Sequence, residues 1–159
     1  MKTEGTVYAL VGLGMLLVGI PVFLLGIVAM LGVLVATMFN GLLSGSIVNL
    51  INVLGIGAVI GGAVGTYAGL YLVNKNGGKF FRLVMGLIAL IFALVSAILA
   101  LLTVSTIIGL FVFLMVMILF LIIADWGFNS DMFTTKFIGA IPIVGRAVVN
   151  VTMRLLPKK

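Results

Sequence analysis

Long apolar stretches alternate with short polar breaks along most of this chain. Four stretches are long enough to cross a bilayer, because a spanning helix needs about 20 mostly apolar residues. They cover residues 6–39, 47–73, 80–102 and 107–124. The breaks between them are a glycine and serine cluster at 40–46, a charged turn at 74–79 and a polar tract at 103–106. The pattern predicts an all-α, polytopic membrane protein with four transmembrane helices.

The first apolar stretch is longer than one crossing requires. As a helix it would reach roughly 50 Å, and Pro21 near its middle removes a backbone hydrogen bond. Two interpretations are open: one kinked helix that tilts or overshoots the bilayer, and a re-entrant pair of short arms. We favour a single long helix kinked at Pro21, because two full crossings would leave each arm below the usual length.

The composition changes after Asp125, where residues 126–131 predict a loop. From residue 143 onward, the apolar residues fall on one helical face and the polar ones on another, as in a helix that lies in the membrane interface. The apolar set is Val144, Ala147, Val148, Val151 and Leu155, and the polar set is Arg146, Asn150 and Arg154. A short helix packed on the end of the bundle is the alternative. The predicted domains are a four-helix transmembrane bundle, 1–124, and a loop with a basic amphipathic interfacial segment, 125–159.

The charges support an even number of crossings. The chain of 159 residues carries nine Lys and Arg against three Asp and Glu, a net charge of +6. Four crossings place every basic residue on the face that holds both termini, and basic loops tend to stay in the cytoplasm. We therefore expect a multi-pass integral membrane protein with cytoplasmic N- and C-termini.

Basic side chains on that inner face are expected to contact anionic lipid headgroups. The alternative is that they only set the orientation of the protein in the membrane, and the two roles are compatible. The candidate contacts are Lys75, Lys79, Arg82, Arg146, Arg154, Lys158 and Lys159.

The residue types available for chemistry are few. The chain is 64% hydrophobic and 8% charged, with no His and no Cys, and its mean hydropathy is +1.50. General bases, thiolate nucleophiles and zinc ligands are therefore mostly missing. We expect no enzymatic activity, no catalytic residue, no cofactor, no metal and no nucleic-acid partner.

The strongest local motif lies on the second predicted helix, where Gly57, Gly61, Gly65 and Gly69 recur every four residues. Small residues at this spacing let a second helix backbone approach closely, which drives association in lipid. The run predicts a helix-packing or oligomer interface, and it resembles the glycine zippers of several channel and pore-forming membrane proteins. Packing against the first helix, which has its own Gly12, Gly19, Gly26 and Ala29, is the simpler explanation.

These observations favour a structural or accessory integral membrane protein that acts by helix–helix and helix–lipid packing. It would be a subunit of a larger membrane complex or a component of a lipid-containing virion or vesicle coat, with lipids and either further copies or other membrane subunits as partners. The alternative is a small homo-oligomeric pore or holin-like channel lined by the glycine-rich second helix. Hydroxyl side chains in the spans are expected to bond their own backbone or a neighbouring helix rather than line such a path.

Overall fold

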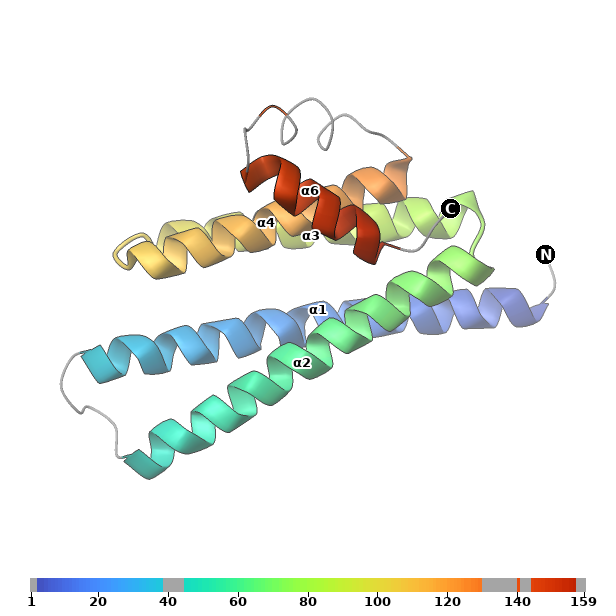
Figure 1. Cartoon of the computed structure of the whole chain (residues 1–159). Helices are drawn as coiled ribbons and strands as arrows, with labels where there is room; N and C mark the ends of the chain where they lie inside the picture. The colour runs from blue at the N-terminus through green and yellow to red at the C-terminus, as the bar shows by residue number, and fades with distance from the viewer. Residues whose placement is uncertain (1–2, 39–44, 130–139, 141–143, 157–159) are drawn as a thin grey trace. The chain divides into compact units, whose positions relative to one another are not determined.

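The computed structural model describes residues 3–38, 45–129, 140 and 144–156, and the regular structure within them is helical (Figure 1). The helices are α1 (Thr3–Met38), α2 (Gly45–Asn76), α3 (Lys79–Leu102), α4 (Ile107–Phe128) and α6 (Val144–Leu155). The first four are long and apolar enough to cross a membrane. The prediction of an all-α polytopic membrane protein with four spans is therefore confirmed.

The first apolar stretch forms one helix. α1 continues through Pro21, so the single-helix prediction is confirmed and the re-entrant pair is not formed. Its 36 residues would extend about 54 Å, well beyond the roughly 30 Å of a bilayer core. The kink at Pro21 stays a prediction.

α4 is longer than the sequence suggested. The loop expected from residue 126 is wrong at its start, because Trp126, Gly127 and Phe128 are helical. A Cβ on Gly127 would lie 2.7 Å from the Gly86 Cα, so this glycine allows two helix backbones to meet rather than a chain reversal. Asn129, with φ 57°, adopts the left-handed conformation that commonly ends helices.

The charged turn between α2 and α3 is shorter than predicted. α2 extends to Asn76, which leaves only Gly77 and Gly78 between the two helices. The Gly77 N–H donates to the Val73 carbonyl at 2.8 Å, continuing the helical pattern. A Cβ on Gly77 would lie 2.6 Å from the Val73 oxygen and 2.7 Å from the Phe81 Cβ, so only glycine fits this tight connection.

The chain divides into two compact units, and α1 and α2 each contribute to both. One unit is Gly14–Gly69, a hairpin of the two long helices. The other combines Met1–Leu13 with Leu70–Lys159 and contains α3, α4 and α6. The predicted boundary at residue 124 stays a prediction.

α3 and α4 form an antiparallel pair with a continuous buried seam. The buried positions on both helices alternate in steps of three and four, the spacing that keeps one face of a helix against its partner. α3 contributes mainly small residues to the seam and α4 contributes larger ones. They are Gly86, Ala89, Ala93, Ser96 and Ala100 on α3, and Gly109, Phe113, Val116, Phe120, Ile123 and Gly127 on α4.

Candidate functional site: glycine faces and a basic end

Within the hairpin of residues 14–69, two pairs of glycines bring the backbones of α1 and α2 together. A Cβ on Gly19 would lie 2.8 Å from the Thr66 nitrogen and 3.1 Å from the Gly62 carbonyl oxygen. A Cβ on Gly26 would lie 2.8 Å from the Gly55 carbonyl oxygen. Both contacts are with backbone atoms, which cannot move aside as a flexible side chain would. The hairpin therefore requires glycine at these positions.

The contacts to α1 fall on different glycines from those that the four-residue spacing singled out. Gly55 and Gly62 make the close contacts, and a Cβ on Gly65 would only touch the Gly19 Cα at 3.6 Å. Cβ atoms on Gly57 and Gly61 would have no neighbour within 4 Å. Gly69, the last residue of the predicted run, is buried. The run is thus divided between positions near α1 and positions that face open space.

The sequence contained a signal for the glycines that do pack. Gly19 and Gly26 are separated by seven residues, as are Gly55 and Gly62. A seven-residue step returns a side chain to nearly the same face of a helix, whereas a four-residue step rotates it by about 40°. Matching seven-residue spacings on two antiparallel helices therefore predict a shared line of contact. The more conspicuous four-residue spacing on the second helix pointed to other glycines.

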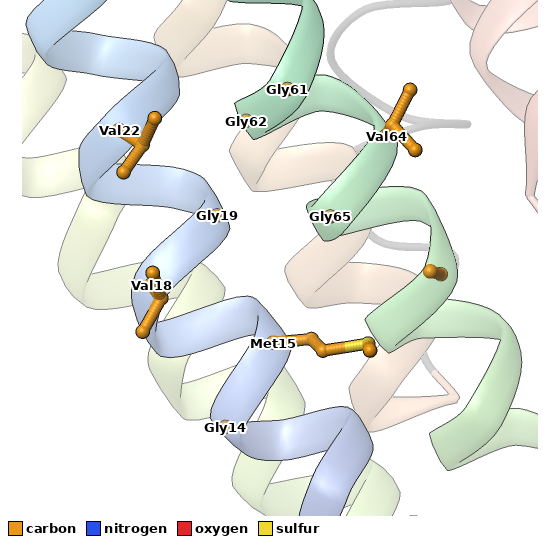
Figure 2. Close-up of a pocket in the computed structure, with 10 residues that line it drawn as sticks. Gly14, Met15, Val18, Gly19, Val22, Gly61, Gly62, Val64 and Gly65 are labelled. Atoms are coloured by element: carbon orange, nitrogen blue, oxygen red, sulfur yellow. The ribbon is translucent and has the colours of Figure 1, made fainter. Parts of the chain in front are cut away.

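An open apolar groove of about 590 Å³ lies between α1 and α2 beside these contacts (Figure 2). Glycines form much of its lining, and the Met15 side chain extends from α1 toward α2 at one end. Apolar side chains and glycines make up the whole lining: Gly14, Met15, Val18, Gly19, Val22, Gly61, Gly62, Val64, Gly65 and Ala68. Such a groove offers shape and dispersion contacts but no group for acid–base or metal chemistry.

A second glycine contact, between α3 and α4, was not anticipated from the sequence. The Gly127 Cβ position lies 2.9 Å from the Gly86 nitrogen, and the Gly86 Cβ position lies 3.3 Å from the Ala124 carbonyl oxygen. Each helix contributes one glycine to this contact, so the sequence of neither helix shows a repeated glycine motif there. The pair closes the seam at the end where Arg82 and Trp126 meet.

Three of the predicted lipid-contact residues, Lys75, Lys79 and Arg82, lie near the α2–α3 turn. Arg82 Nη2 donates to the Asn74 Oδ1 at 2.6 Å, and its guanidinium carbon lies 5.8 Å from the centre of the Trp126 ring. The Lys75 ammonium lies 5.7 Å from the centre of the Tyr71 ring. Lys79, at the start of α3, is exposed. Three of the seven candidate cations therefore lie at one end of the unit that combines Met1–Leu13 with Leu70–Lys159.

The remaining candidates lie on α6 or beyond it. Arg146 and Arg154 are exposed, and Lys158 and Lys159 lie outside the described residues. α6 contacts α4, with Thr152 and Leu156 buried, whereas Val151 and Leu155 are more than half exposed. The helix thus presents part of its predicted apolar face outward.

Hydroxyl groups in the spans bond carbonyls of their own helix or turn, as expected. Thr66 Oγ1 donates to the Gly62 oxygen at 2.7 Å, and the fully buried Ser96 donates to the Phe92 oxygen at 2.8 Å. Thr37, Thr103 and Thr106 do the same with nearby carbonyls. These five hydroxyl donors are therefore engaged locally.

The fold and these surfaces define a polytopic α-helical integral membrane protein. No protein-family model matches the chain, and neither a curated protein nor a solved structure matches it.

Proposed function

We propose that this protein is a structural or accessory integral membrane protein that works through helix–helix and helix–lipid packing. It would serve as a subunit of a larger membrane complex or as a component of a lipid-containing virion or vesicle coat. The proposal rests on the open glycine surface of α2, where Gly57 and Gly61 have no neighbour within 4 Å of their Cβ positions and Gly61 borders the groove.

Glycines on this face favour a helical partner over lipid alone. Lipid covers any apolar helix surface, but it gains nothing from glycine, which costs about 0.5–1 kcal/mol relative to alanine within a helix. Another helix does gain, because small residues permit close backbone approach and dispersion contacts. Large apolar side chains around the glycines are also exposed, with Val53 at 68% and Val64 at 63%. The surface therefore has the composition of a packing face that a further helix would cover.

The mass of the assembly in its native membrane tests this proposal. We expect the 16.7 kDa chain, extracted into lipid nanodiscs, to carry further copies or other subunits. Gly57→Leu with Gly61→Leu should reduce the particle to a monomer, because the added side chains prevent close approach. Ile56→Leu with Ile60→Leu, on exposed positions of the same helix, is the matched control and should leave the assembly intact. A monomer in the unaltered protein would contradict the proposal.

The alternative, a homo-oligomeric pore lined by α2, receives less support from the side-chain chemistry. The Thr66 hydroxyl of α2 donates to its own helix, and the lining of the groove is apolar. Reconstituted liposomes at high protein density should therefore retain small dyes and ions. Leakage that disappears in Gly61→Leu would favour the pore instead.

Both termini are proposed to lie in the cytoplasm, on the side of the α2–α3 turn. This orientation follows from the basic residues at that turn and the tendency of such loops to stay inside. Single cysteines at Gly78 and Ser105, which flank α3, should react with a membrane-impermeant reagent from opposite sides. Labelling of Gly78→Cys from outside intact cells would reverse the orientation.

A further inference from the structure

Two cations near the α2–α3 turn lie against aromatic rings, Lys75 against Tyr71 and Arg82 against Trp126. Tyrosine and tryptophan concentrate at the membrane–water boundary, because each combines an apolar ring with a polar group. Lysine and arginine beside them extend to the headgroups. We therefore expect the end of the unit that carries the α2–α3 turn to lie at the depth of the lipid headgroups.

Arg82 is held in position by contacts from two other helices. Its Nη2 donates to Asn74 on α2 at 2.6 Å, and its guanidinium lies over Trp126 on α4. Arginine presents five N–H donors in a planar arrangement that suits phosphate oxygens. A guanidinium that is already oriented loses less side-chain entropy when it binds an anion. Arg82 is thus better prepared for binding than an unconstrained surface cation.

Exposed apolar side chains accompany these cations. Phe80 is 72% exposed and Leu83 is 48% exposed, and they flank Arg82 in sequence. Residues 3–13 and 70–129 of this unit contain three cations and two carboxylates, Glu4 and Asp125, and Asp125 is already engaged in an interaction. The occupant that suits this surface carries a negative group for the cations and hydrocarbon for Phe80. A soluble polyanion would leave the phenylalanine uncovered.

We propose that Tyr71, Lys75, Lys79, Arg82 and Trp126, here termed the basic collar, bind the phosphate of an anionic phospholipid. Lys75, Lys79 and Arg82 supply the charge, the two rings position Lys75 and Arg82, and Phe80 contacts the upper acyl chain. This proposal concerns a different surface from the glycine face of α2 and does not depend on the proposed helix packing.

Quenching of a single tryptophan by brominated lipids tests the proposal. The chain has one tryptophan, Trp126, which is only 6% exposed. Trp126→Phe with Phe80→Trp keeps a ring at both positions and moves the fluorophore to the exposed site. In mixed bilayers, brominated phosphatidylglycerol should quench this tryptophan with an apparent binding preference of about fivefold or more over brominated phosphatidylcholine.

Variants of the collar separate a charge effect from a change in folding. Lys75→Gln with Lys79→Gln should lower the preference severalfold, and adding Arg82→Gln should remove it. Lys75→Arg with Lys79→Arg retains the charge and should retain the preference. Equal quenching by both lipids, or a preference that survives all three neutralisations, would overturn the proposal. Absence of quenching by either lipid would show that protein covers this surface, and would overturn it too.

Discussion

The two helical hairpins achieve close packing in different ways. In the α3–α4 pair, small residues of α3 face buried phenylalanines of α4. In the apolar 18-residue segment of each helix, 33% of α3 and 39% of α4 is buried. In the hairpin of residues 14–69, glycine backbones meet directly, yet only 11% of the corresponding apolar segment of α2 is buried. The first arrangement is a closed seam, and the second leaves apolar surface and two glycines uncovered. The comparison indicates that the α3–α4 seam is filled by its own side chains, whereas the glycine surface of α2 within the hairpin of residues 14–69 leaves room for another helix.

The largest effect is expected from Gly62→Leu in the glycine hairpin. A Cβ at this position would overlap the Phe23 backbone nitrogen and lie 2.7 Å from the Gly19 oxygen, so the two helices must separate. Overpacking typically costs 1–3 kcal/mol, and contact with rigid backbone favours a loss of about 3 kcal/mol or more. Unfolding by sodium dodecyl sulfate in mixed micelles measures the change.

The adjacent glycine is the matched control. Gly61 borders the open groove and has no neighbour within 4 Å of its Cβ position, so Gly61→Leu should leave the stability of the isolated chain nearly unchanged. If both substitutions have equal effects, the division of α2 into a packed side and an open side is wrong.

A somewhat smaller loss is expected from Phe113→Ala in the α3–α4 seam. Phe113 is fully buried, and its removal creates a cavity next to the small residues of α3. Phenylalanine-to-alanine changes cost about 3–5 kcal/mol in water-soluble cores. Here we expect about 2 kcal/mol, because lipid is as apolar as the core and mainly the packing contribution is lost. The same detergent titration applies, with Phe111→Ala, at an exposed position of α4, as the control that should change little.

Gly127→Ala should have an intermediate effect of about 1–2 kcal/mol, because the new methyl group would meet the backbone of Gly86. Gly57→Ala should have the opposite sign and stabilise the isolated chain slightly, since its Cβ position is open and alanine favours helix. Thermal unfolding of both variants in the same detergent gives the comparison. Destabilisation by both would imply that Gly57 is also packed within the chain.

The smallest effect is expected from Ser96→Ala, within about 0.5 kcal/mol. Its hydroxyl donates to the Phe92 carbonyl, whose helical hydrogen bond remains when the hydroxyl is removed. A loss above about 1.5 kcal/mol in the detergent titration would show that Ser96 bonds across the α3–α4 seam instead.

The sequence predicts the spans well because a bilayer crossing requires a long apolar segment, and the number and approximate limits of α1–α4 followed from that requirement. It does not specify which glycines pack. Gly57 and Gly61 stand out by spacing, but the partner of Gly62 is a residue of α1, and that pairing depends on the register between two helices. The end of α4 was misjudged for a similar reason. By sequence alone Gly127 is typical of a turn. Its role as a helix contact depends on Gly86, which is distant in the sequence and adjacent only in the folded structure.

Photocrosslinking in native membranes shows whether another protein helix covers the glycine surface of α2. The chain has no cysteine, so a benzophenone maleimide attached to Gly61→Cys reports one position, with Leu101→Cys on α3, 71% exposed, as the lipid-facing reference. We predict that the probe at residue 61 captures a protein of discrete mass, a second copy or another subunit, and that the probe at residue 101 captures lipid. Lipid adducts alone at both positions would show that no protein helix packs on the glycine surface of α2.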